Sequence, residues 1–229
     1  MKNRLLLAVL LFLAACGPSE TEPPAPLTVQ YTAAARPWLA PLEECAAAAG
    51  LVIRPVGRAA AFFDPAADLA IRIGEPAAFS APAYQIGEEQ IAFVIHPQNP
   101  VTALDWSALQ SVFGGQTVNW QEVGGPDLPI QVWAYAEGED LQQILGTVVL
   151  QNRPIASTAR LAASPEDMAA SIGADPAAIG FLPGRQVPET LRRLTLPSQA
   201  QSALTIPVLA LPGPEPSQAI VSILACLQR

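Results

Sequence analysis

The sequence is poor in lysine, histidine and cysteine. Its 229 residues include 12 Lys and Arg against 20 Asp and Glu, with one histidine and three cysteines. The single lysine, Lys2, lies at the N-terminus close to Arg4. Nucleic acids and anionic lipid headgroups are bound by clustered Lys and Arg, so an acidic surface of this kind excludes both as partners.

The residue types and motifs of common catalytic sites are scarce as well. The only histidine, His96, precedes a proline, and there is no G-x-S-x-G, H-E-x-x-H or G-x-x-x-x-G-K motif. No set of Cys and His has the spacing of metal ligands. A hydrolase that uses carboxylates alone, from Glu137, Glu139 and Asp140, is an alternative that no specific motif supports. We therefore expect a protein that is not an enzyme and needs no cofactor or metal.

Long apolar runs are also few, and the longest lies near the N-terminus. It extends from Leu5 to Ala15, follows Lys2 and Arg4, and ends at Cys16. This layout predicts a signal peptide over residues 1–15, because a membrane-spanning helix needs about 20 apolar residues. Leu-Ala-Ala-Cys at its end resembles the bacterial lipobox, which predicts that Cys16 is lipidated. The alternative is a core cysteine behind a signal peptide that is cut elsewhere.

The segment after Cys16 contains four prolines, two glutamates and no large apolar residue between Gly17 and Pro26. Such a composition cannot bury enough surface to offset the entropy of ordering, so residues 16–26 are expected to be a disordered tether. The protein is then extracytoplasmic and anchored to a bacterial membrane by lipid alone. The globular part begins near Leu27 and has about 200 residues, enough for one large domain or two small lobes.

Two cysteines remain after Cys16, an even number in an oxidising compartment. Cys45 lies in the first helix-like segment and Cys226 in the last. A disulfide between them would close a long loop and stabilise the fold by roughly 4–5 kcal/mol as an upper figure. Two separately buried thiols are the alternative.

Short apolar runs alternate with helical periodicity along the globular part, which predicts an α/β fold class. Expected helices include one that begins after Asp105 as a cap and ends at Gly114, and one over about residues 140–150. Strands are expected at residues 27–31, 51–56, 68–73, 90–96, 130–135, 177–184 and 204–211, with further helices at 36–49, 165–172 and 215–227.

The stretch "IAFVIHPQNPVTALDWSALQSVFGGQTVNWQEVGGPDLPIQVW", residues 91–133, resembles a segment of the phosphate-type periplasmic solute-binding proteins, a PBP-like type 2 family. In that family a strand and an NPV turn lead into a helix, an F-G stop, NW and a GG turn. The later "AAIGFLPG" is similar to the family's AIGY strand. On this resemblance Asn119 and Trp120 are expected to brace the second lobe. Gly114 can end its helix in a left-handed conformation, and Gly124 and Gly125 permit a tight turn.

The resemblance also implies two α/β lobes joined by hinge crossovers, with a ligand in the cleft between them. The first lobe would comprise residues 27–95 plus 187–229, and the second would comprise residues 96–186. The first and last helices then share a lobe, which also favours the Cys45–Cys226 disulfide.

The ligand motif departs from the family pattern, in which an arginine precedes Gly-Ser-Gly-Thr at the start of a helix. Aligned on Gly138, Tyr135 stands at the arginine position, and Glu139 and Asp140 stand at the serine and the second glycine. Thr32 keeps a hydroxyl in the first lobe. Extra carboxylates beside phosphate would each cost on the order of 1 kcal/mol, so phosphate is not the expected ligand.

The expected function is a solute-binding protein that passes a small molecule to an ABC permease. One hypothesis is an organic ligand with a positive group against the carboxylates, an anionic end near Arg72 and its body against Tyr135 or Trp133. A second is that the acids only complement a helix dipole and that the arginines are solvated. A different class of function is a lipoprotein whose binding shell serves sensing or protein contacts. The candidate ligand residues are Thr32, Arg72, Tyr135, Glu137, Glu139 and Asp140.

Overall fold

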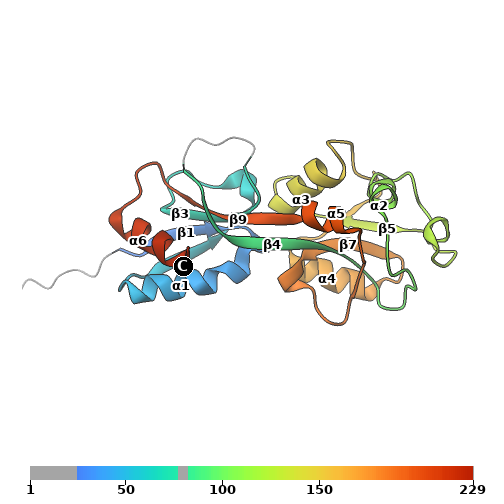
Figure 1. Ribbon diagram of the computed structural model, residues 1–229, viewed down its shortest axis with the longest axis horizontal. Coiled ribbons are helices and arrows are strands. Elements are labelled where there is room, and N and C mark those ends of the chain that lie inside the picture. The colour runs from blue at the N-terminus through green and yellow to red at the C-terminus, as the bar shows by residue number, and fades with distance from the viewer. Residues whose placement is uncertain (1–24, 77–81, 229) are drawn as a thin grey trace, which may run out of the picture.

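The computed structural model describes residues 25–76 and 82–228 (Figure 1). The predicted signal peptide, Cys16 and nearly all of the predicted tether lie outside the described residues. Within the described ranges, no helix is both long enough and apolar enough to span a bilayer.

Strands and helices alternate along most of the chain. The strands are β1 (Leu27–Tyr31), β2 (Ile53–Gly57), β3 (Leu69–Ile73), β4 (Tyr84–Ile95), β5 (Gln131–Ala134), β6 (Arg160–Leu161), β7 (Ala178–Pro183), β8 (Arg192–Arg193) and β9 (Thr205–Pro212). The α-helices are α1 (Leu39–Ala48), α2 (Trp106–Phe113), α3 (Asp140–Ile144), α4 (Pro165–Ala174), α5 (Ser198–Ala203) and α6 (Gln218–Leu227). Short 3-10 segments are η1 (Ala33–Trp38), η2 (Ala60–Phe62), η3 (Trp120–Val123) and η5 (Gly184–Gln186), and η4 (Leu145–Val149) is π-helical.

Among the described residues the strands join in the order β2-β1-β3-β9-β4-β7-β5-β6, and β8 also pairs with β4. Strand β1 is parallel to β2 and β3, whereas β9 is antiparallel to both β3 and β4. Figure 1 shows two α/β lobes with β4 and β9 running between them. The first lobe contains β1, β2, β3, α1 and α6, and the second contains α2, β5, α3, α4 and β7. The predicted two-lobed α/β class is confirmed.

Strand β4 changes partners along its length. Its first part, up to Gln90, pairs with β9, and its second part, from Ile91, pairs with β7 and β8. The lobe boundaries predicted at 95/96 and 186/187 stay predictions. The pairing favours a crossing a few residues earlier on β4 and a return to the first lobe near residue 204, because β8 still pairs with Val94 and Ile95.

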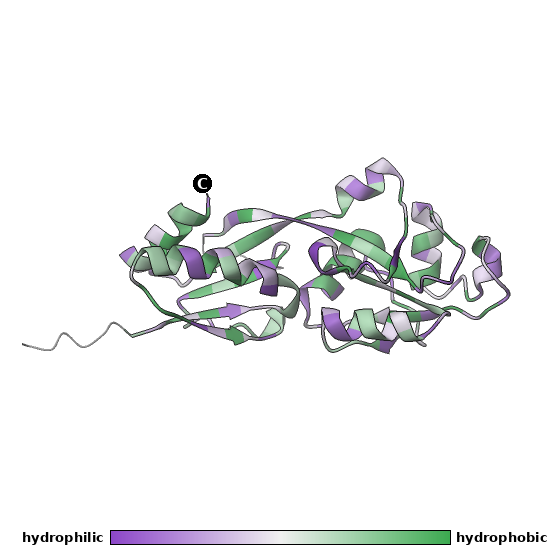
Figure 2. Ribbon diagram, turned by 90° about the horizontal axis from the view of Figure 1, so that it is seen from below, coloured by the Kyte–Doolittle hydropathy of each residue, from purple (hydrophilic) through white to green (hydrophobic). Residues whose placement is uncertain are grey.

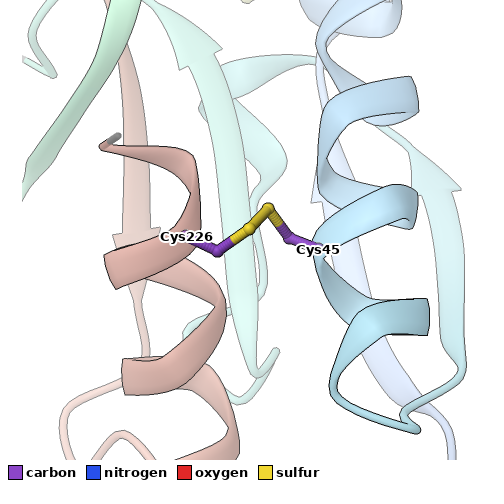
Figure 3. The surroundings of a disulfide bond; sticks show 2 residues. All are labelled: Cys45 and Cys226. Carbon is purple, nitrogen blue, oxygen red and sulfur yellow. A yellow bond between two sulfur atoms is a disulfide. The ribbon is translucent and has the colours of Figure 1, made fainter.

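The first lobe is closed by a disulfide between its first and last helices. Cys45 of α1 and Cys226 of α6 are bonded, with their Cα atoms 5.9 Å apart (Figure 3). The predicted disulfide is therefore confirmed. It fixes α6, which is otherwise held by the apolar side chains Ile220, Ile223 and Leu224 on its buried side.

The second lobe has an aromatic core. Phe93, Phe113 and Phe181 meet with ring centroids 5.2–6.0 Å apart, and each is almost completely buried. Each comes from a different element, so the cluster joins α2 to the β4–β7 pair. The strands at the centre are largely hydrophobic, whereas hydrophilic residues lie mainly on the helices and connections (Figure 2).

The glycine-rich stretch after α2 largely behaves as expected. Trp120 is fully buried and its indole N–H donates to the Ala177 carbonyl oxygen at 2.9 Å, which confirms that it braces the second lobe. Gly124 is left-handed with φ of 82°. The prediction for Gly114 was wrong, because Gly114 keeps a right-handed conformation and Gly115 takes the positive φ of 75°. The left-handed residue therefore comes one position later than expected.

A tight cluster lies where the chain passes between lobes. The Trp38 ring packs against Gly87 of β4 so closely that a Cβ atom there would lie 2.1 Å from the ring. The Arg185 guanidinium lies 4.5 Å from the centre of the same ring, and its Nε is 3.4 Å from the buried Glu89 carboxylate. Trp38 therefore contacts both the crossing strand β4 and η5 of the second lobe.

Candidate functional site: the cleft between the lobes

The cleft is built on the first lobe by the ends of β1 and β3. Thr32 follows β1 and caps η1, where its hydroxyl oxygen accepts from the Ala35 amide at 3.3 Å. The hydroxyl donates across the cleft to the Asp140 carboxylate at 2.5 Å. Thr32 is fully buried, so this interaction is shielded from water. The predicted first-lobe hydroxyl is thus at the interface of the lobes.

Asp140 enters the cleft from the second lobe as the first residue of α3. Its carboxylate also accepts from the Ile73 amide at the end of β3 at 2.9 Å and from the Leu141 amide at 2.8 Å. The residue has no exposed surface. Burial raises the pKa of Asp140, and the Thr32 hydroxyl, the Ile73 amide and the charge of Arg72 act in the opposite direction.

Arg72 supplies a positive charge that acts on this carboxylate. It lies on β3, is 4% exposed, and one of its terminal nitrogens donates to the Gln143 side-chain oxygen at 2.8 Å. Its Nε atom is buried without a hydrogen-bond partner among the described residues. Burial lowers the pKa of Arg72, while the nearby Asp140 raises it.

The other three predicted residues have different surroundings. Tyr135 is buried, its hydroxyl donates to the Phe181 carbonyl oxygen at 3.1 Å, and burial raises its pKa. Glu139 is the half-buried N-cap residue of α3, and its pKa is raised by burial and by Asp140. Glu137 is exposed. The structure therefore joins Thr32 and Asp140 directly, places the charge of Arg72 near enough to act on Asp140, and packs Tyr135 into the core.

Further contacts close the lobes around this cluster. The Ala61 amide of η2 donates to the Gly138 carbonyl oxygen at 3.0 Å. A Cβ atom at Gly138 would lie 3.3 Å from the Ala61 side chain, so the two loops are in close contact. At the cleft mouth, Arg36 and Glu166 approach to 3.9 Å, but both are well exposed and the pair contributes little.

The space beside the polar cluster is nearly filled. A void of about 10 Å³ borders Ala33, Tyr135 and Asp140, and a wider groove of about 380 Å³ lies at the mouth beside Arg36, Arg58 and Glu139. A void of the smaller size is at the limit for one water molecule.

A larger cavity of about 920 Å³ lies beyond Arg72, between the β3 and β9 ends of one lobe and the second lobe. Its polar wall includes Arg72, Glu137 and Gln143, and Tyr135 also lines it. The apolar part of the wall is formed by Ile144, Val148, Leu150, Ile155, Leu161 and Ile206.

Two elements of this site were missed from the sequence. The Ile73 amide carries no residue-type signal, because any residue offers the same backbone N–H. The π-helical segment η4 follows α3 where a continuous helix to residue 150 was expected, and it places Val148 on the cavity wall. Gln143 falls one turn after Asp140, a spacing that could have suggested a shared face.

Two α/β lobes joined by crossing strands and closed over a polar cleft define the class of two-lobed binding proteins. Residues 27–212 match the PBP superfamily domain, so the chain belongs to that family.

Solved structures agree with this fold at low sequence identity. A putative phosphate ABC transporter substrate-binding protein with bound phosphate from Clostridium perfringens is 16% identical, with a TM-score of 0.78 over 89% of this chain and 93% of that one. An ABC-type phosphate transport receptor from Vibrio cholerae is 18% identical, with a TM-score of 0.71 over the same shares. The CcmR regulatory domain of Synechocystis PCC6803, in complex with 2-PG, is 12% identical, with a TM-score of 0.66 over 88% and 95%.

Proposed function

We propose that this protein is the extracytoplasmic, lipid-anchored solute-binding component of an ABC-type transporter, with a ligand other than phosphate. The main support is the cavity of about 920 Å³ between the lobes, which falls within the range of roughly 300–1,000 Å³ that small-molecule sites occupy. Family membership and the likeness to two phosphate-transport receptors support the transport role.

The cavity wall favours an organic solute that carries both charges. Arg72 would receive an anionic end, because a buried guanidinium offers charge-assisted donors to a carboxylate. Glu137 would face a positive group, and the apolar wall beside Ile144 and Ile155 would cover the body of the molecule. The buried Asp140 and the neighbouring Glu139 argue against phosphate, since two like charges 4 Å apart repel by about 1 kcal/mol even in water.

A thermal-shift screen at neutral pH tests this proposal. Small zwitterions, organic acids, amines and inorganic phosphate would be compared, and a zwitterion should raise the melting temperature because it binds only the folded state. Glu137→Gln should weaken binding of that solute by roughly 1.5–5-fold, the range for an exposed charge pair. Glu44→Gln, an exposed glutamate on α1, is the matched control and should bind as the wild type does. A response to phosphate alone would contradict the altered specificity.

The lipid anchor requires its own test. Cells expressing the full-length chain would be labelled with a fatty acid and separated into membrane and soluble fractions. The wild type should carry the label and sediment with membranes, whereas Cys16→Ala should lose both properties. Label on the Cys16→Ala chain would contradict lipidation at this residue.

A sensing function without transport is the second candidate, and the closed cleft favours it. The lobes meet directly through the Thr32–Asp140 hydrogen bond and the Ala61–Gly138 hydrogen bond. The similar fold of a regulatory domain also supports this possibility. Absence of any melting-temperature increase across the full solute screen would favour sensing or protein contacts over transport.

A further inference from the structure

The first lobe presents a group of hydrogen-bond donors to the cleft. The Thr32 hydroxyl, the Ile73 amide and the Arg72 guanidinium all belong to elements of this lobe. The hydroxyl and the amide donate to one and the same oxygen, Oδ2 of Asp140. Two converging donors with a buried cation nearby form a site for an anion, because each would otherwise lose its hydration without compensation.

The second lobe supplies the occupant of that site. Asp140 is completely buried, and its other carboxylate oxygen accepts from the Leu141 amide. Only about 10 Å³ of space remains beside it. A second oxyanion could not enter while the lobes are closed, and it would meet a like charge if it did.

We propose that the Asp140 carboxylate is a built-in anion that fills a small-oxyanion site on the first lobe, closes the lobes without solute and thereby excludes inorganic phosphate. This inference concerns regulation of the same cleft, and it rests on the proposed function only in treating that cleft as the place where a solute enters. Asp140 then sets specificity by occupying the anion site itself, and it does not contact the ligand.

The carboxylate can be removed in two ways that separate space from charge. Asp140→Ala deletes the carboxylate and leaves room for a molecule of that size, beside donors that remain on the first lobe. Asp140→Asn keeps the volume but replaces one acceptor oxygen with a donor N–H. A site built for an anion should therefore accept free formate in the Ala variant and remain blocked in the Asn variant.

The first experiment measures melting temperature with sodium formate against sodium chloride at equal ionic strength. Formate should raise the melting temperature of Asp140→Ala by about 3 °C or more when it is well above its Kd, as expected for a ligand that binds only the folded state. It should leave the wild type and Asp140→Asn unchanged, and phosphate should leave the wild type unchanged. A folded Ala variant without a formate response, or a wild type stabilised by phosphate, would overturn the proposal.

The second experiment uses the wild type alone, so it does not depend on the folding of a variant. Small-angle X-ray scattering without solute should give the radius of gyration of the closed lobes, and added phosphate should not change it. A larger radius that shrinks when phosphate is added would show that the site is open and free, which contradicts the proposal.

The two proposals fail in different ways. A solute screen without hits would contradict transport while leaving the formate response of Asp140→Ala intact. A formate response that is absent, combined with a solute that binds the wild type, would remove the role of Asp140 and leave solute binding standing.

Discussion

The aromatic core of the second lobe and the polar cluster in the cleft are equally inaccessible to water, yet they are held together by different forces. Phe93, Phe113 and Phe181 gain their stability from apolar area, which any well-packed set of similar volume could supply. Thr32 and Asp140 depend on specific donors and acceptors, since a buried polar group without its partner is costly. The core thus supports the fold, and the cluster determines how the lobes meet.

The strongest way to break the core is to remove a ring. Phe181→Ala should lower the free energy of unfolding by about 3–5 kcal/mol, because it leaves a cavity between Phe93 and Phe113 and removes an edge-to-face contact with Tyr135. Phe181→Leu, which keeps most of the volume, should cost much less. Urea unfolding followed by circular dichroism measures both. Equal losses for the two variants would mean that packing volume is not what matters here.

The polar cluster should respond almost as strongly to the loss of its cation. Arg72→Met should lower the free energy of unfolding by about 2–4 kcal/mol, because it leaves the buried Asp140 carboxylate without a compensating charge. Adding Asp140→Asn should recover part of that loss, since the double variant has no uncompensated charge. Urea unfolding of the two single variants and the double variant gives the coupling, and strictly additive losses would contradict electrostatic coupling of the two residues.

A smaller effect is expected from the hydroxyl alone. Thr32→Val should cost about 1.5–3 kcal/mol, the range for a hydrogen bond to a charged group, because it keeps the side-chain shape and removes the donor to Asp140. Thr32→Ser retains the hydroxyl and should be closer to the wild type. Chemical unfolding under identical conditions ranks the three proteins. A Val variant as stable as the wild type would show that the hydroxyl contributes nothing.

The smallest expected effect is on the pH dependence of stability, through the titration of Asp140. Burial raises its folded pKa, so the folded state keeps the proton to a higher pH than the unfolded state does. As pH rises from about 4 through the folded pKa, the wild type should lose stability relative to Asp140→Asn, by at most about 1.36 kcal/mol for each pH unit. The neighbouring Glu139, whose pKa is also raised, acts in the same direction in both proteins.

Unfolding free energies of the wild type and Asp140→Asn across this pH range test that sign. The difference between them should widen towards higher pH and then become constant. A difference that narrows towards higher pH would mean that the hydrogen-bond donors stabilise ionised Asp140 more than burial destabilises it.

Patterns that rest on local chemistry were predictable from the sequence. The Asp105 cap, the buried Trp120 and the strands β1 and β9 follow from capping preference and apolar runs. Predictions failed where tertiary contacts decide. The first part of β4 carries Glu88 and Glu89, which hide its strand character until β9 lies beside it. The short helix α5 has only Ala200 as a buried residue, so it lacks an apolar periodicity.

In the cleft, too, the sequence predicted the types of residue but not the contacts between them. The sequence placed Thr32, Arg72 and Asp140 among the candidates because their types suit ligand binding. It could not show that Thr32 and Asp140 contact each other, because that depends on residues 108 positions apart meeting through lobe closure. Tyr135 was expected near a ligand by alignment; it borders the larger cavity, and its ring also packs on Phe181 with a centroid distance of 5.1 Å.

The position of Trp38 gives the protein an intrinsic optical probe. Its indole lies against Gly87 on the crossing strand β4 and under Arg185 of η5, and its ring nitrogen is buried without a partner among the described residues. Any rotation of one lobe on the other must alter the water and charge around this ring. Its fluorescence, isolated by replacing Trp106 and Trp133 with Phe and by retaining the deeply buried Trp120 as an internal reference, would therefore follow domain motion without an attached dye.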